Sequence, residues 1–169
     1  MIRKAEHADL TTIKKITEAC TQHLIDQNIF QWNLNYPSLA VFKKDIEEDA
    51  LYVYLNKEKI VGCIMFSEEK DPLYNTVNWL TPDGQNLYIH RLAVHPKNQK
   101  LGIARQLMDF AENFAQHSQM KSIRLDTFSQ NPRNIRFYKA RGYNYRGDVY
   151  FVNQSKHPFH CFEKQIKRI

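Results

Sequence analysis

The chain has 169 residues, of which 43% are hydrophobic and 25% are charged. These values are typical of a globular protein that buries one core, which excludes a disordered chain. No run approaches the roughly 18 apolar residues of a membrane span, and the N-terminus lacks the apolar segment of a signal peptide, so we expect a cytoplasmic protein. The formal charge of +6 suits a polyanionic partner, either nucleic acid, an acidic surface or a phosphorylated cofactor.

The N-terminal third is predicted to contain a short strand and two helices. Residues 2–6 indicate the strand. Residues 9–27 follow as a helix, because their apolar side chains recur at spacings of three and four, and Asp9 is suited to cap it. A second helix is predicted to begin after the cap Ser38 and to end near Asp49. Its inward-facing residues are expected to be Leu39, Phe42 and Ile46.

Two segments without periodicity are predicted to be loops. Residues 28–37 are rich in asparagine and aromatic residues, and they carry Trp32 and Tyr36. Residues 68–85 contain two prolines and one glycine, which favours a long excursion over the surface. Loops of such length are usually functional or mobile.

Strands are predicted at residues 51–55 and 60–66, joined by a four-residue hairpin connection. The three cysteines lie far apart in apolar contexts and form no C-x-x-C pair. We therefore expect buried free thiols and no metal centre. These cysteines are Cys20, Cys63 and Cys161.

The segment from Leu87 to Phe114 indicates an anion site made by a strand, a basic loop and a helix. Leu87–Val94 is apolar and is followed by Pro96, which cannot donate to a sheet. The helix begins near Ile103 and has one apolar stripe. Its backbone N–H groups and dipole favour an anion. The stripe comprises Ile103, Leu107, Phe110, Ala111 and Phe114, and the basic residues of the loop region are Lys97, Lys100 and Arg105.

The glycine pattern of this loop indicates which anion. Its only glycine is Gly102, so the loop lacks the glycines of a P-loop or of a dinucleotide-binding turn. It reads Val94-x-Pro96-x-x-Gln99-x-x-Gly102-x-Ala104. This pattern resembles the acetyl-CoA pyrophosphate loop of the Gcn5-related N-acetyltransferase (GNAT) family. The alternative is an ordinary strand-to-helix turn in which Gly102 relieves crowding.

A second segment resembles the same family. Residues 121–127 alternate as a strand, and a helix is then predicted between the cap Asn131 and the left-handed exit Gly142. Two final strands are predicted at 143–153 and 159–167. The residues that match the family's last segment are Asn131, Phe137, Tyr138, Gly142 and Tyr143.

The predicted order β-α-α-β-β-β-α-β-α-β-β indicates an α/β fold. The family resemblance implies a GNAT-like three-layer α-β-α domain with a mixed, mostly antiparallel central sheet. We expect residues 1–169 to form this single N-acetyltransferase domain, with a right-handed β-α-β crossover between residues 87–94 and 121–127.

The resemblance also implies acetyl-CoA as acyl-donor co-substrate. In the family the pantetheine arm lies like an extra strand along the central strand, and the glycine loop holds the pyrophosphate. The cofactor-binding residues implied here are Leu92, Ala93, Val94, Gln99, Lys100, Leu101, Gly102, Ile103, Ala104, Asn131 and Asn134.

The hydrophobic phase of the central strand changes near Arg91. Leu87 and Ile89 occupy odd-numbered positions, whereas Leu92 and Val94 occupy even-numbered ones. In a regular strand the two pairs would therefore point to opposite faces. A bulge would reconcile the two, and a backbone N–H beside it would be placed to polarise a thioester carbonyl. Alternatively, Tyr88 faces the core together with Leu92 and Val94, and the strand is regular without a bulge.

Two residues are candidates for proton transfer. Tyr138 matches the position that in many family members protonates the leaving thiolate, although an aromatic residue in a short helix is also a common core residue. His90 is the only titratable base of suitable pKa in the central strand. The alternatives are that His90 contacts substrate or belongs to the core, with the amine losing its proton through water.

The acceptor is expected to be a primary amine of a small molecule or peptide, bound near Trp32, Tyr36 and His90. The alternative is that Trp32 and Tyr36 only cover the core. A non-catalytic acyl-CoA-binding or sensor module is the competing function. Nucleic-acid binding is not expected, since no recognition motif is present, and no membrane partner is expected. The oligomeric state stays open, with a homodimer to be tested.

Overall fold

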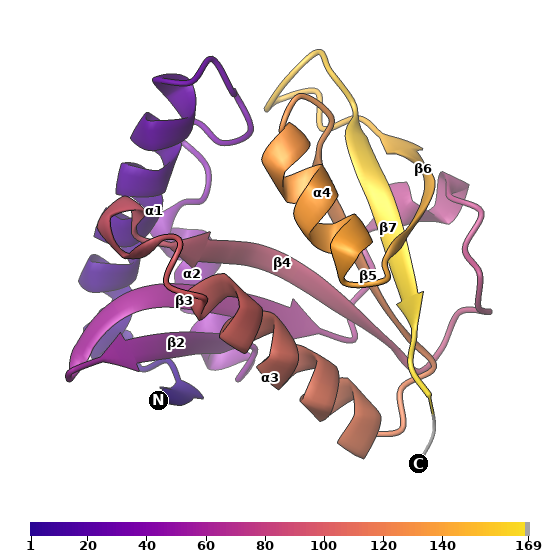
Figure 1. Ribbon diagram of the computed structural model, residues 1–169, viewed down its shortest axis with the longest axis horizontal. Helices are drawn as coiled ribbons and strands as arrows, with labels where there is room; N and C mark the ends of the chain where they lie inside the picture. The colour runs from indigo at the N-terminus through magenta and orange to yellow at the C-terminus, as the bar shows by residue number, and fades with distance from the viewer. Residues whose placement is uncertain (168–169) are drawn as a thin grey trace. The chain divides into compact units, whose positions relative to one another are not determined.

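A computed structural model describes residues 1–167 (Figure 1). The described chain contains seven β-strands, four α-helices and three short 3-10 turns. The strands are β1 (Ile2–Lys4), β2 (Leu51–Asn56), β3 (Lys59–Ser67), β4 (Asn86–Val94), β5 (Ser122–Phe128), β6 (Asn144–Val149) and β7 (Phe159–Gln165). The helices are α1 (Leu10–Ile25), α2 (Leu39–Glu47), α3 (Ile103–His117) and α4 (Pro132–Ala140), and the 3-10 turns are η1 (His7–Asp9), η2 (Pro72–Thr76) and η3 (Pro96–Asn98).

The strands follow the order β1-β2-β3-β4-β5-β7-β6 in a mixed sheet. The β4–β5 pair is parallel, whereas β1–β2, β2–β3, β5–β7 and β6–β7 are antiparallel. The predicted element order and the mixed, mostly antiparallel sheet are therefore confirmed. The chain divides into two compact units. Unit 1 comprises Met1–Phe66 and His90–Phe110, and unit 2 comprises Ser67–Ile89 and the chain from Ala111 onward.

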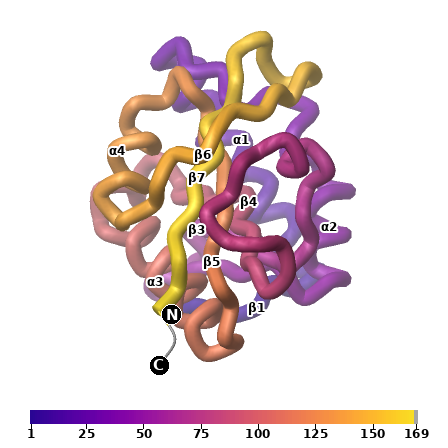
Figure 2. Tube along the Cα trace, turned by 90° about the vertical axis from the view of Figure 1, so that its right-hand side faces the viewer, coloured from indigo at the N-terminus to yellow at the C-terminus, as the bar shows by residue number. Residues whose placement is uncertain are grey.

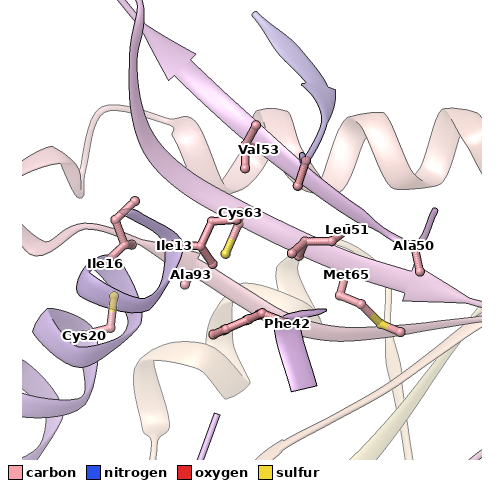
Figure 3. Close-up of a cluster of buried hydrophobic side chains, with 11 residues drawn as sticks. Ile13, Ile16, Cys20, Phe42, Ala50, Leu51, Val53, Cys63, Met65 and Ala93 are labelled. Carbon is pink, nitrogen blue, oxygen red and sulfur yellow. The ribbon is translucent and has the colours of Figure 1, made fainter. Parts of the chain in front are cut away.

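Unit 1 has a layer of helix on each face of its strands. Alternate residues of β2 point to opposite faces, as the pleat of a strand requires. Leu51 and Val53 join the buried cluster beneath α1 and α2 (Figure 3). Tyr52 points to the other face, where its ring stacks on Phe66 with centroids 4.7 Å apart and meets Phe110 of α3 edge-on at 5.0 Å. The first half of α3 therefore covers the face opposite α1 and α2.

A glycine allows β3 to approach β4 closely in unit 1. A Cβ atom added to Gly62 would lie 2.9 Å from the carbonyl oxygen of Ala93, which is closer than a carbon atom tolerates. It would also press on Leu107 and Val94 at 3.4 Å. Gly62 thus sets the packing behind the last residues of β4, and an isolated glycine inside a strand is a sign of such an approach.

Unit 2 contains β5, β7 and β6, with β7 between the other two. In Figure 2, α4 and residues 67–85 lie on opposite sides of these strands. One face of these strands carries α4, where Tyr138 contacts the ring of Phe162 at 6.4 Å. The opposite face carries residues 67–85, which include η2. Tyr74 of η2 is fully buried there, and its hydroxyl donates to Asp126.

Residues 67–85 run over the surface as predicted, since most of them are exposed, and a buried ion pair holds this segment in place. Arg124 and Glu163 have fully buried side chains, and Nε of Arg124 lies 3.1 Å from Oε1 of Glu163. Arg124 also pairs with Asp83 at 2.7 Å, and its guanidinium lies 4.6 Å from the Trp79 ring. Thr81 donates to Glu163 at 2.6 Å. Thr81 and Asp83 of this segment therefore serve as partners of the buried ion pair, because buried charges require partners.

Local predictions were corrected in three places. Lys57 and Glu58 both have positive φ, so the β2–β3 hairpin turns on two residues rather than four. Asp9 precedes α1 but does not cap it, since its carboxylate accepts from the Glu6 backbone and pairs with Arg3 at 2.7 Å. Two residues expected to face inward are exposed instead, to 50% for Leu39 and 38% for Phe114.

Candidate active site

The basic loop between β4 and α3 has the backbone of an anion site. Lys100 and Gly102 have φ values of 66° and 77°, a left-handed conformation that glycine adopts without steric cost. A Cβ atom at position 102 would meet no other atom within 4 Å, so this glycine serves backbone conformation and leaves open space beside the loop. The first N–H groups of α3 have no partner within the helix. The loop and the first turn of α3 also carry three exposed basic residues, Lys97, Lys100 and Arg105.

The loop is braced against the end of β4. The carbonyl oxygen of Val94 accepts hydrogen bonds from the Gln99 amide at 3.1 Å and from the Cys20 thiol at 3.2 Å. These two bonds occupy both lone pairs of that oxygen. Any pairing of pantetheine with residues 92–94 would therefore use their other backbone groups. Burial raises the pKa of the Cys20 thiol to about 12, so Cys20 stays a neutral donor.

The strand conformation of β4 is interrupted at Arg91. This residue has a φ of 47°, which confirms a local irregularity where the hydrophobic phase changes. Its guanidinium binds Asp45 of α2 through two bonds, Nε to Oδ2 at 2.8 Å and a terminal nitrogen to Oδ1 at 2.6 Å. The other terminal nitrogen donates to the hydroxyl of Tyr36 at 3.0 Å. The loop predicted to bind the acceptor is thereby attached to the irregular residue of β4.

His90 lies directly before Arg91 and is held neutral. Burial lowers its pKa to about 3, and the neighbouring positive charge of Arg91 acts in the same direction. A neutral imidazole can accept a hydrogen bond or relay a proton from an amine. A pKa so low makes it a weak base, because it holds a proton poorly.

The pKa of His90 predicts a pH dependence of stability. Between pH 6.5 and 3 the unfolded chain binds a proton at this histidine that the folded protein does not bind, so the contribution of His90 to stability falls as the pH is lowered through this window. We expect the free energy of unfolding, measured in urea, to fall by about 1–2 kcal/mol more in the wild type than in His90→Gln between pH 7 and pH 5. The exposed-residue variant His7→Gln serves as control for the loss of any histidine. Equal losses in wild type and His90→Gln would contradict the lowered pKa.

In unit 2 the second predicted motif has the expected local structure. Asn131 is buried and caps α4, since its side-chain oxygen accepts from the backbone N–H of Asn134 at 3.2 Å. The amide of Asn134 donates to Thr127 at 3.4 Å. Gly142 has a φ of 86° at the exit from the helix. The predicted start and stop signals are therefore confirmed, and Asn131 has a capping role whatever else it binds.

Tyr138 points into the packed face of unit 2. It is 6% exposed and contacts the rings of Phe137, Tyr143 and Phe162. Burial raises the pKa of its hydroxyl, and the charge of Asp126 raises it further. Tyr138 therefore keeps its proton throughout the neutral range, as a proton donor requires.

Sequence reasoning found Arg91 as a break in the strand but missed its partners. Asp45 is a buried carboxylate on the inner face of α2, three residues from the fully buried Phe42. An acidic residue in phase with an apolar helix face was the available signal. Cys20 was predicted as a buried thiol, and all three cysteines are indeed free and buried. Its bond to Val94 had no sequence signal, because it joins residues 74 positions apart.

Comparison with known proteins agrees with this architecture. Residues 17–143 match the family model described as the acetyltransferase (GNAT) family. An uncharacterized N-acetyltransferase, YesJ of Bacillus subtilis strain 168, is 23% identical over 96% of this chain and 88% of its own. An acetyltransferase of the GNAT family from Streptococcus agalactiae has a TM-score of 0.85 at 18% identity, covering 100% of this chain and 96% of that one. The structure of yncA from Salmonella typhimurium with its cofactor acetyl-CoA has a TM-score of 0.70 at 19% identity, covering 100% and 95%.

The family model thus identifies the class of protein as an acetyltransferase. The chain belongs to the GNAT family, since the family model matches well over half of its length. No helix among residues 1–167 is long and apolar enough to cross a membrane.

Proposed function

We propose that the protein is an acetyl-CoA-dependent N-acetyltransferase that acetylates a primary amine of a small molecule or peptide. The observation that carries this proposal is the basic loop with left-handed Gly102, placed between an irregular β4 and the N-terminus of α3. Such a loop offers backbone N–H groups and positive charge to a pyrophosphate. We further propose that the whole chain acts as one N-acetyltransferase domain in the cytoplasm, with a homodimer to be tested by its mass in solution.

The donor would be held by unit 1. Residues Gln99 to Ala104 bind the pyrophosphate, and backbone groups of Leu92 to Val94 pair with the pantetheine arm. A backbone N–H beside Arg91 polarises the thioester carbonyl, which is the role of an oxyanion hole. In unit 2, Asn131 and Asn134 are the remaining proposed cofactor contacts.

The reaction requires two proton transfers. The amine nitrogen forms a bond to the acetyl carbon, and the carbon–sulfur bond breaks. Tyr138 donates a proton to the departing thiolate and regains one from solvent. The amine loses its proton to water through His90, whose neutral ring accepts a hydrogen bond and passes the proton on. Acetylated amine and free CoA thiol are the products.

We place the acceptor against Trp32, Tyr36 and His90. The support comes from unit 1 alone, where Tyr36 bonds to the residue that follows His90. Trp32 is partly buried against the cluster that includes Ala93 of β4. Aromatic faces beside a neutral imidazole suit an amphipathic amine, and each desolvated aromatic contact contributes on the order of 0.5–2 kcal/mol to a bound cation.

The function is tested by following free thiol released from acetyl-CoA. The panel comprises small amines, amino acids, polyamines, aminoglycosides and peptides with free N-termini. We expect at least one amine to accelerate release above the hydrolytic background in a saturable manner. Gly102→Glu serves as the inactive control. If acetyl-CoA binds and no amine in the panel accelerates thiol release, the proposal of an amine acceptor loses its support.

The acceptor site gives a separate prediction. With an identified amine at saturating acetyl-CoA, Trp32→Ala and His90→Ala should each raise KM or lower kcat by about tenfold, the effect of losing roughly 1.4 kcal/mol of binding. Trp79→Ala is the matched control, since this tryptophan packs on Arg124 in unit 2. Wild-type kinetics in both folded variants would show that the amine binds elsewhere.

A further inference from the structure

We infer that Arg91 is a positioning residue for acetyl transfer, whose side chain, held by Asp45, keeps the β4 backbone in its left-handed conformation. The inference rests on the proposed function, because it assigns a purpose to the backbone of β4. It adds two residues, Asp45 and the side chain of Arg91, to the machinery.

The conformation of Arg91 needs an explanation. A φ of 47° is unfavourable for a residue with a Cβ atom, and glycine is the residue that normally adopts it. Strained backbone of this kind persists only where surrounding structure imposes it, and it occurs preferentially at functional sites. The residue lies in the half of β4 that leads into the proposed cofactor loop. The strain is therefore located where it has a chemical use.

The Arg91 side chain supplies the restraint. Its guanidinium binds both carboxylate oxygens of Asp45. The side chain of Arg91 is only 11% exposed and that of Asp45 only 3%. A two-bond pair fixes orientation as well as distance, which a single bond does not. Asp45 lies on α2, which packs through Phe42 into the buried cluster of unit 1. The guanidinium is thus tied to a second element that is itself anchored in the core.

The same guanidinium connects the backbone with the acceptor loop. Its remaining terminal nitrogen donates to the Tyr36 hydroxyl at 3.0 Å. The Arg91 carbonyl accepts from the Cys63 thiol at 3.9 Å, so the main chain of this residue is also contacted from β3. One residue therefore joins the strand, α2 and the loop proposed to receive the amine. The backbone N–H proposed to polarise the thioester carbonyl and the loop proposed to bind the amine would thus be positioned together.

Two double variants isolate the backbone effect. Arg91→Ala with Asp45→Asn and Arg91→Gly with Asp45→Asn both remove the guanidinium and the buried negative charge. They differ only in how well residue 91 tolerates a positive φ. If the side chain holds the strained backbone, alanine lets it relax, whereas glycine still samples it. We expect kcat to be about tenfold higher in the double variant with glycine (the glycine pair) than in the one with alanine (the alanine pair). Their affinities for acetyl-CoA, measured by calorimetry, should be equal.

Single variants and structures complete the test. Asp45→Asn alone should lower kcat while leaving acetyl-CoA affinity unchanged, and Tyr36→Phe should raise KM for the amine about threefold with little change in kcat. Crystal structures should show residue 91 at negative φ in the alanine pair. Equal kcat in the two double variants, or a retained left-handed residue in the alanine pair, would overturn the inference. If the wild type acetylates no amine, the proposed function fails by itself, and the φ value of residue 91 in the alanine double variant still decides whether the Arg91 side chain holds the backbone.

Discussion

Gly102→Glu is expected to lower the affinity for acetyl-CoA by at least about 100-fold, or roughly 2.7 kcal/mol. The added carboxylate would enter the open space beside the loop, where we place the pyrophosphate, and would repel it. The left-handed φ of 77° would also be lost or strained. Isothermal titration calorimetry measures the change directly, and thermal unfolding shows whether the fold is kept.

Gly102→Ala separates charge from backbone strain. Alanine carries the same conformational penalty but neither bulk nor charge, so its affinity for acetyl-CoA should fall much less than that of the glutamate variant. Equal losses in the two variants would assign the effect to loop conformation. Wild-type affinity in Gly102→Glu would place the cofactor away from this loop.

Tyr138→Phe is expected to lower kcat by roughly 10²-fold, the lower range for a lost general acid, with little change in acetyl-CoA affinity. The ring remains, so the packing against Phe162 is retained. Steady-state kinetics with a saturating acceptor provide the measurement. Because the pKa of Tyr138 is raised, deprotonation of this group should not reduce activity at or below its ordinary pKa near 10.

Tyr143→Phe is the matched control for this variant. Tyr143 is also buried in unit 2, and its hydroxyl donates to Glu112 at 3.2 Å. Its loss should reduce stability without a selective effect on kcat. Full activity in Tyr138→Phe would make Tyr138 a packing residue, and similar kcat losses in both variants would point to disturbed packing.

The elements of the fold were predictable wherever local signals agreed. The β4–loop–α3 segment and α4 carry periodicity, caps and turn glycines in the same short stretches, and both formed as predicted. Residues 67–85 run over the surface as predicted, but their contacts with Arg124 and Glu163 were not predictable, because these two residues lie far away in sequence. Polar residues that complete a buried network look like surface residues in a sequence, since only tertiary contacts distinguish them.

In the candidate site, too, local features were predictable from the sequence and long-range contacts were not. Gly102 and the change of phase at Arg91 are local features of the backbone, and a sequence displays both. The pairing of Arg91 with Asp45 and Tyr36 joins three segments and is absent from any local pattern. Gly62 has a weak signal as an isolated glycine in a strand, but the carbonyl it accommodates belongs to β4.

A non-catalytic acyl-CoA sensor on the same fold is the main competing function. A sensor would bind acyl-CoA through the loop at Gly102 in the same way, but it would need neither a proton donor nor a binding site for an amine. The presence of a tyrosine at position 138 and the attachment of Tyr36 to β4 favour the enzyme, because a sensor needs neither a proton donor nor an amine-binding loop fixed to the strand.

Transfer of a labelled acetyl group tests the central claim most directly. The protein is incubated with acetyl-CoA that carries deuterium in the acetyl group and with the amine panel, and the products are analysed by mass spectrometry. We predict an amine that gains the deuterated acetyl group on nitrogen with wild type and far more slowly with Tyr138→Phe. Binding of acetyl-CoA with Gly102-dependent affinity, but no labelled amine from any member of the panel, would contradict the account and favour the sensor.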